Sequence, residues 1–303
     1  MGRHHVRSTA HGTATSPARA TVIVITGASS GIGLCTTLLA AEHGARLVLV
    51  ARSQDVLDAT VQTIRDAGGE AIAVAADVAE RTQLDEAAAA AIRHFGRIDT
   101  WVNNAGVAIY GKLADVDERD SRRLFDVNFW GLVHGSMAAL PHLLAARGTL
   151  INLGSEASEA VLPLQGMYAA SKHAVKGFTD TLRIELEHLD GAPVSVVLIQ
   201  PTAVNTPYPQ HARNYLREEP TLPKPMIAPL RVAEAILHAA EHGGRDVKVG
   251  LLASANVAMT HLLPRLADRL SALRSEQQRQ AQPARDPLGT LYRAGESGRI
   301  HGD

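Results

Sequence analysis

Cysteine is nearly absent from this 303-residue sequence, in which Cys35 is the only one. A single cysteine excludes an internal disulfide framework and favours a reducing, cytoplasmic setting. Cys35 falls within the apolar pattern of the first expected helix, where we expect a small buried side chain rather than a reactive thiol.

Charge of one sign is also lacking, because the formal net charge is only −1. Nucleic-acid binding needs a basic patch or stripe, so we expect no nucleic-acid partner. Long apolar runs are missing as well, and no stretch reaches the length of a membrane-spanning helix. The most apolar late segment, residues 249–263, is interrupted by polar side chains, and we expect it to pack on the domain or on a partner chain.

The two ends of the sequence lack apolar periodicity. Residues 1–20 carry arginines and histidines, no acidic residue and no apolar core of a secretory signal, so we predict a disordered extension. Residues 276–303 are polar with interspersed glycine and proline, and we predict a disordered tail. Residues 21–275 between them are expected to form one domain, with the proline-rich stretch 205–229 as a substrate lid or loop.

Short β-branched runs alternate with helical patterns along that domain. This alternation predicts a Rossmann-type, doubly wound α/β fold, whose seven-stranded parallel sheet is flanked by helices on both faces. Ligands of such sheets bind beyond the carboxyl ends of the strands. The expected strands are Thr21–Ile25, Arg46–Val50, Ala71–Ala75, Ile98–Val102, Thr149–Leu153, Val194–Ile199 and Asp246–Val249.

A glycine-rich loop follows the first expected strand, where residues 26–33 read T-G-A-S-S-G-I-G. Glycines permit a tight turn and a close backbone approach, and the helix that follows points free N–H groups at an anion. The loop is therefore a candidate dinucleotide phosphate site. Its candidate binding residues are Gly27, Ser29, Ser30, Gly31, Ile32 and Gly33.

The second expected strand ends without a carboxylate, which NAD(H) binders usually place there for the ribose hydroxyl. Arg52 and Ser53 follow it instead. A guanidinium pairs well with a 2′-phosphate, so we predict NADP(H) as the preferred cofactor, with NAD(H) as the alternative. Further cofactor contacts are expected after the third and fourth strands, from Asp77, Val78, Asn104, Ala105 and Gly106.

Tyr168 and Lys172 have the i, i+4 spacing that brings two side chains to one face of a helix. A nearby ammonium and an oxidised nicotinamide ring are expected to lower the pKa of the phenol, so that Tyr168 exchanges a proton with a carbonyl or alcohol oxygen. Ser155, after the fifth strand, is placed to bond the same oxygen. Asn128 is a poor helix former in a helical stretch, which indicates a function such as anchoring a water that relays protons to Lys172.

These motifs resemble those of the short-chain dehydrogenase/reductase family, in its single-domain branch. The resemblance covers about residues 22–249. It implies a nicotinamide cofactor and a catalytic set of Ser155, Tyr168 and Lys172, with Asn128 as fourth member and Lys172 also on the nicotinamide ribose. It also implies cofactor contacts from Pro201 and Thr206, although Thr202 stands where the family usually has glycine.

The resemblance further implies a homodimer or homotetramer, built through helices at about residues 121–144 and 167–188. The function indicated is that of an NADP(H)-dependent oxidoreductase, which interconverts a ketone or aldehyde and an alcohol. Residues 156–165 and 205–229, with Tyr208, His211 and Tyr215, are the expected specificity elements for a medium-sized, fairly apolar small molecule.

Three alternatives remain open. The chain can be a catalytically silent NADP(H)-binding sensor or scaffold of the same fold, or an epimerase or dehydratase that uses the same tyrosine and lysine. The third alternative is a zinc hydrolase, because His238-Ala-Ala-Glu-His242 matches an inverted zinc-peptidase motif. The glycines that follow His242 indicate a helix C-terminus instead, so we predict no metal site.

Overall fold

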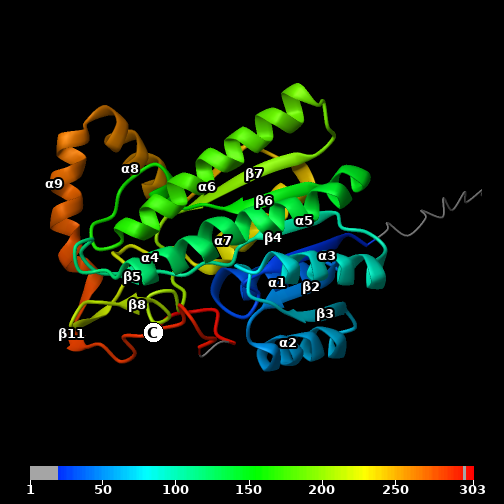
Figure 1. Cartoon of the computed structure of the whole chain (residues 1–303), viewed down its shortest axis with the longest axis horizontal. Coiled ribbons are helices and arrows are strands. Elements are labelled where there is room, and N and C mark those ends of the chain that lie inside the picture. The colour runs from blue at the N-terminus through cyan, green and yellow to red at the C-terminus, as the bar shows by residue number, and fades with distance from the viewer. Residues whose placement is uncertain (1–19, 296–297) are drawn as a thin grey trace, which may run out of the picture.

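The computed structural model describes residues 20–295 and 298–303. The predicted N-terminal extension falls almost entirely outside these residues. Seven parallel strands form the central sheet, in the order β10-β7-β6-β4-β1-β2-β3 (Figure 1). The predicted parallel sheet is confirmed. Its strands are β1 Val22–Thr26, β2 Arg46–Ala51, β3 Glu70–Ala75, β4 Thr100–Asn103, β6 Thr149–Leu153, β7 Ser195–Pro201 and β10 Asp246–Val249.

Successive residues of the central strand β1 face two different cores. Val24 packs in the cluster beneath one helical layer, whereas Ile23 and Ile25 pack in the cluster beneath the other. This alternation is the period of two that a strand imposes on its side chains. One layer contains α1 (Gly31–Glu42), α2 (Gln54–Asp66) and α7 (Pro229–His242), and the other contains α3 (Arg81–Phe95), α5 (Gly131–Ala146) and α6 (Gly166–Ile184).

The predicted helical stretches at 121–144 and 167–188 are each divided. The first comprises α4 (Glu118–Phe125), a π-helical turn at Asp126–Trp130 and α5. The second comprises α6 and a π-helical turn at Glu185–Leu189. Such π turns often lie at functional sites, and the first one contains Asn128.

The substrate loop at 205–229 has structure of its own. It contains β8 (Arg213–Asn214), which pairs with β5 (Ile109–Tyr110), and β9 (Glu218–Pro220). After β10, the helices α8 (Leu251–Leu262) and α9 (Pro264–Arg274) form a hairpin beside the sheet (Figure 1). In the late apolar segment Val249 and Val257 are buried, whereas Leu262 and Leu263 are 78% and 56% exposed, so only part of the segment packs on its own domain. No helix within the described ranges combines the length and apolar character needed to cross a membrane.

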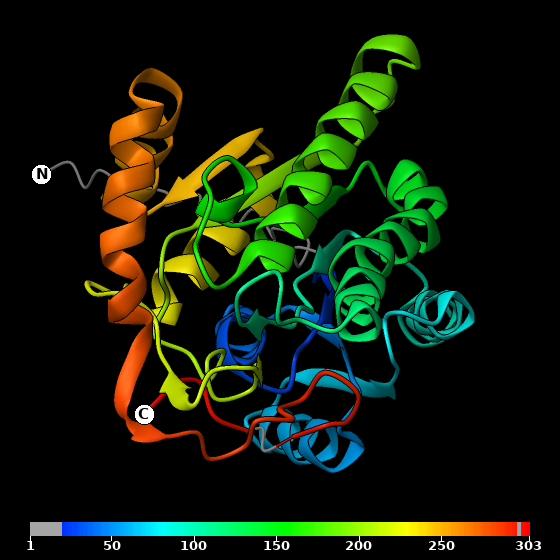
Figure 2. The ribbon, with the colours of Figure 1, turned by 60° about the vertical axis from the view of Figure 1, so that its left-hand side comes forward.

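The C-terminal segment differs from the disordered tail that we expected at 276–303. A 3₁₀ turn at Ser275–Gln278 leads into β11 (Arg279–Pro283), which pairs antiparallel with β9. The chain then crosses to α2 and the loop after β1 (Figure 2). On this path Leu291 is fully buried in the core cluster of the α3 and α5 layer.

Candidate active site

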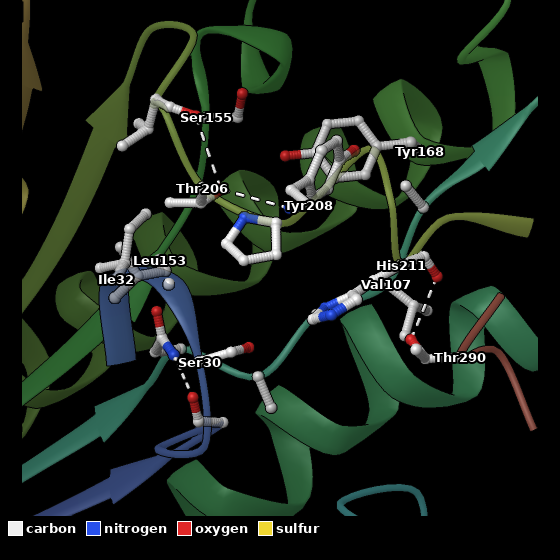
Figure 3. Close-up of a pocket in the computed structure, with 18 of the residues that line it drawn as sticks. Ser30, Ile32, Val107, Leu153, Ser155, Tyr168, Thr206, Tyr208, His211 and Thr290 are labelled. Carbon is white, nitrogen blue, oxygen red and sulfur yellow. Dashed lines mark hydrogen bonds between the residues drawn. The ribbon is translucent and has the colours of Figure 1, made fainter. Parts of the chain in front are cut away.

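One cleft lies at the carboxyl ends of the central strands, where β1 separates the two halves of the sheet. Nearly all of the predicted site residues line it (Figure 3). Gly33 and Asn128 are the two predicted residues outside the lining. The lining includes Gly27, Ser29, Ser30, Gly31, Ile32, Arg52, Ser53, Asp77, Val78, Asn104, Ala105, Gly106, Ser155, Tyr168, Lys172, Pro201 and Thr206.

The glycine-rich loop needs glycine for two different reasons. Gly27 has a φ of 67°, and a Cβ there would lie 2.8 Å from the Cα of Ala105. Gly33 lies one turn into α1, and a Cβ on it would be 2.1 Å from the carbonyl oxygen of Gly27. Gly27 therefore lets the loop after β4 approach closely, while Gly33 lets α1 pack against the carbonyl group of Gly27.

The loop after β4 is tied to the end of β1. The Asn104 side chain donates to the carbonyl oxygens of Thr26 and Gly27, at 2.9 and 3.2 Å. The Thr26 hydroxyl accepts from the main-chain N–H groups of Asn104 and Ala105, at 3.0 and 3.1 Å. The Asn104 side chain therefore joins the ends of two neighbouring strands and fixes the distance between two walls of the cleft.

Arg52 reaches the cleft from the end of β2, and its partners come from the C-terminal segment. Its Nη2 donates to the carbonyl oxygen of Thr290 at 2.6 Å, and its Nη1 lies 3.5 Å from that of Leu291. Asp77, on the adjacent strand end, pairs with Arg123 instead. No sequence pattern connects residues so far apart, so the contact of Arg52 with Thr290 was not foreseen.

Tyr168 and Lys172 lie one turn apart on α6 and both line the cleft, where Lys172 is buried and Tyr168 is half-buried. The Lys172 Nζ donates to the carbonyl oxygen of Leu153 at 2.7 Å and lies 5.8 Å from the centre of the Tyr168 ring. Burial lowers the pKa of Lys172 to about 8. This lysine therefore titrates within reach of neutral pH.

The pKa of Tyr168 differs from the expected lowering. Burial raises it, and side-chain hydrogen bonds with Ser155 and Tyr208 oppose part of the rise. Removing the phenolate from water costs more free energy than the hydrogen bonds with Ser155 and Tyr208 supply. The Tyr168 hydroxyl therefore keeps its proton at neutral pH, and it lies within hydrogen-bonding reach of Ser155.

Asn128 is buried and binds the main chain of the loop after β4. Its Oδ1 accepts from the N–H of Val107 at 2.8 Å, and its Nδ2 donates to the Val107 oxygen at 3.0 Å and to Ser171 at 3.2 Å. The side chain thus ties this loop to α6, and it makes no direct bond to Lys172 among the interactions found in the described part of the chain. The water-anchoring role stays a prediction.

Thr202 occupies the usual glycine position without backbone strain. Among the described residues, only Arg147 and Leu164 have a positive φ without being glycine. The Thr202 hydroxyl donates to the carboxylate of Glu156 at 3.0 Å, and Asn256 of α8 donates to the same oxygen at 3.2 Å. The departure from the family pattern therefore adds a polar contact between the strand β7 end and the first specificity segment.

The specificity residues divide into two groups. Tyr208 and His211 line the cleft, and the Tyr208 ring packs edge-on against Tyr168 with centres 5.5 Å apart (Figure 3). Tyr215 does not line it, because its hydroxyl binds Asp120 of α4 at 2.8 Å. Its expected role at the substrate pocket is thus unsupported by its position.

Buried polar side chains connect the predicted specificity segments to Gln278, a lining residue that carried no signal in the sequence. The Tyr208 hydroxyl donates to Gln165 at 3.0 Å, and Gln165 donates to Gln278 at 2.8 Å. Gln165 and Gln278 are both almost completely buried. A glutamine in a polar stretch of sequence is normally expected at the surface, so its burial depends on the tertiary structure. Thr290, Ala294 and Gly295 also line the cleft from outside the predicted site segments, whereas Leu162, Leu222 and Pro223 lie within the predicted specificity segments 156–165 and 205–229.

The histidines of the zinc-like motif lie at the end of α7. Their rings stack with centres 4.3 Å apart, and the His242 Nδ1 lies 3.0 Å from the carbonyl oxygen of His238. Gly243 ends the helix with a φ of 68°. In the part of the chain that the structure describes, no three histidine, cysteine or acidic side chains come together as a metal site would require.

Known proteins resemble this chain in sequence and in fold. The chain is 47% identical over 252 residues to the uncharacterised oxidoreductase YxnA of Bacillus subtilis (strain 168), a match that covers 82% of this chain and 70% of that protein. A short-chain dehydrogenase/reductase of Burkholderia phymatum in complex with NAD superimposes with a TM-score of 0.73 at 29% identity, over 89% of this chain and 98% of that one. An alcohol dehydrogenase of Thermococcus sibiricus complexed with 5-hydroxy-NADP superimposes with a TM-score of 0.67 at 26% identity, over 76% and 95%.

The family model of the short chain dehydrogenases matches residues 21–216, which span the sheet from β1 to the substrate loop. With its seven-stranded sheet and its oxidoreductase relatives, the chain belongs to the short-chain dehydrogenase family.

Proposed function

We propose that this oxidoreductase uses NADP(H) to interconvert a ketone or aldehyde and the corresponding alcohol. The observation that carries the proposal is that the half-buried Tyr168 and the buried Lys172 line the same cleft as the glycine-rich loop. A proton donor and a phosphate-binding loop in one water-poor cavity are what a coupled hydride and proton transfer requires.

The residues of the cleft fit a dinucleotide. A Cβ on Gly27 would collide with Ala105, so glycine lets the glycine-rich loop and the loop after β4 lie close together, and α1 presents its N-terminus beside them. The phosphate residues of the proposal are those of the glycine-rich loop, and Asn104 to Gly106 are placed for the sugar and ring. Lys172, Pro201 and Thr206 are placed for the nicotinamide half. The nicotinamide cofactor supplies or accepts the hydride when it is bound.

The chain's own side chains handle the proton. Tyr168 donates its hydroxyl proton to the carbonyl oxygen in reduction and takes a proton from the alcohol in oxidation. Ser155 bonds the same oxygen and holds it near Tyr168. Because burial raises the pKa of Tyr168, oxidation needs positive charge close to the phenol, and Lys172 supplies part of it.

Arg52 supports NADP(H) over NAD(H). No carboxylate stands at the end of β2, and the two carbonyl partners of Arg52 leave its positive charge unneutralised. A guanidinium in this state is a strong partner for a 2′-phosphate. Ser53 adds a neighbouring hydroxyl.

The substrate end of the cleft supports a medium-sized, fairly apolar carbonyl compound. Leu162, Tyr208, Leu222 and Pro223 line it. Gln165 adds one buried amide, which favours a compound with a single further polar group.

A screen with both reduced cofactors tests the proposal. The purified chain is mixed with NADPH or NADH and a panel of steroids, sugars, aliphatic ketones and aromatic aldehydes, and cofactor absorbance is followed. We expect faster oxidation of NADPH with at least one apolar carbonyl compound. Tight binding of NADPH without turnover of any carbonyl or alcohol would favour the sensor or scaffold instead.

We also propose a homodimer or homotetramer through α5 and α6. Trp130, Leu144 and Ile184 lie on or beside these helices and are 50%, 37% and 47% exposed. Large apolar side chains gathered on a surface mark an interaction face. Sedimentation velocity of the purified chain tests this proposal, and a monomer at micromolar concentration would contradict it.

A further inference from the structure

The C-terminal segment covers the cofactor half of the cleft. We call residues 286–295 and 298–303 the C-terminal strap. Thr290, Ala294 and Gly295 of the strap line the same cavity as the glycine-rich loop. In Figure 2 the segment runs across the carboxyl side of the sheet, from the substrate loop to α2.

The strap joins the two halves of the site through main-chain hydrogen bonds. At the substrate loop, Thr290 N donates to the carbonyl oxygen of His211 at 2.8 Å. At the glycine-rich loop, Gly298 N donates to Ser29 O at 2.7 Å and Gly31 N donates to Arg299 O at 2.9 Å. The strap is therefore attached on both sides of the cavity.

A buried leucine anchors the middle of the strap. Leu291 is fully buried in the cluster that contains Val50 and Leu124, whereas its neighbour Leu288 is 59% exposed. The Tyr292 hydroxyl adds a bond of 2.9 Å to Asp120. Burial of one leucine offsets much of the conformational entropy that ordering a short polar segment costs.

The strap also sets the direction of Arg52. The carbonyl oxygen of Thr290 accepts from Arg52, and that of Leu291 accepts from Arg123 at 3.2 Å and is the second acceptor of Arg52. These acceptors are neutral, so the guanidinium charge stays available to an anion. A guanidinium that is already oriented loses less entropy when it binds a phosphate.

We propose that the strap is the outer wall of the dinucleotide site, which orients Arg52 and has to lift before the cofactor leaves. This inference rests on the proposed function. Thr290, Ala294 and Gly295 line the open cavity, whereas Arg299 accepts from the N–H of Gly31. The strap therefore borders the cavity and also has to release this donor of the glycine-rich loop before it can bind a phosphate.

The test is the dissociation rate of NADPH from the full chain, measured by stopped-flow fluorescence. Leu291→Ala removes the buried anchor, and Leu288→Ala makes the same change at an exposed position of the strap. We expect Leu291→Ala to raise the dissociation rate by about tenfold or more, because opening of the strap becomes easier. Leu288→Ala is expected to stay within about twofold of the wild type.

Tyr292→Phe is the second variant, because it removes only one hydrogen bond and keeps the fold. It is expected to raise the rate by about threefold or more. Hydrogen exchange at residues 288–295 is expected to slow when NADPH binds. Equal rates in all three variants and the wild type, or a lower Kd in Leu291→Ala, would overturn the strap as a retaining wall.

The outcomes separate the two proposals. Binding of NADPH with no difference among the variants overturns the strap and leaves the proposed function standing. Binding of NADH alone, with the expected rate differences, supports retention and overturns the role of Arg52. No binding of either dinucleotide to the wild type or to any variant overturns the proposed function and the strap with it.

Discussion

The ammonium of Lys172 donates a hydrogen bond of 2.7 Å to the main-chain carbonyl oxygen of Leu153. This contact joins α6 to the end of β6, and it holds a charged group in a place where burial lowers its pKa to about 8. The site thus keeps a lysine that the folded chain is reluctant to protonate. Buried groups with a shifted pKa, which lower the stability of the folded chain, are common at functional sites.

The stability of Lys172→Met relative to the wild type is expected to depend on pH. A lysine whose pKa is lower in the folded chain binds fewer protons there, so the wild type gains stability as the pH rises from about 8 towards 10.5. At pH 7 the buried ammonium costs about 3 kcal/mol, and Lys172→Met removes that cost.

Urea unfolding at pH 7 and pH 10 measures this effect. The stability of Lys172→Met minus that of the wild type should fall by up to about 3 kcal/mol over this range. Lys176→Met, on the same helix and half-buried beside Asp180, is the matched control. A pH-independent difference for Lys172→Met would mean that the lysine is not perturbed in the folded chain.

Tyr168→Phe is expected to lower kcat by about 100-fold or more while NADPH affinity changes little, because only the proton donor is lost. Tyr215→Phe is the control, since Tyr215 lies outside the cleft and bonds α4. Steady-state kinetics gives kcat for both variants, and NADPH titration gives their Kd for the cofactor. Activity retained by Tyr168→Phe would refute its role as acid and base.

Arg52→Asp is expected to weaken NADPH binding by about tenfold to 100-fold, because it removes the charge partner of the 2′-phosphate. The new carboxylate can accept from the ribose hydroxyl of NADH, so the preference should move towards NADH. The Kd values for NADPH and NADH give the ratio. An unchanged ratio would place the phosphate on other residues.

Gly33→Ala and Gly177→Ala are expected to act in opposite directions. A Cβ on Gly33 meets the carbonyl oxygen of Gly27, so the variant should lose about 1–3 kcal/mol of stability and bind NADPH poorly. Gly177 lies in α6 with nothing within 4 Å of an added Cβ, and alanine there should gain about 0.5–1 kcal/mol. Chemical unfolding of both variants tests the pair, and equal effects would contradict it.

The main sheet was predictable because its signals are local. Each strand is a short β-branched run between turn residues, and β6 and β10 have the bounds that the sequence predicts. The other five strands begin or end within two residues of the prediction. The glycine-rich loop was equally predictable, because a strand before it and a helix after it are typical of a dinucleotide phosphate site.

The sequence indicated most of the residues that line the site, but it indicated less well what each of them does there. The sequence indicated both Ile32 and Gly33 as cofactor contacts. Only the structure shows that Ile32 lines the cleft, whereas Gly33 allows α1 to pack against the glycine-rich loop. It also placed Lys172 beside Tyr168, but the balance of burial and charge that raises the Tyr168 pKa depends on surrounding atoms.

By itself, the sequence determined the order of strands and helices and the motifs that end at one edge of the sheet, because these depend on neighbours in the chain. Only the tertiary structure determined that the C-terminal segment is ordered and where it lies. Its order comes from one buried leucine and from main-chain bonds to residues more than two hundred positions earlier, such as Ser29 and Gly31. Main-chain donors and acceptors are the same in every sequence, so no pattern of side chains could reveal which of them would meet.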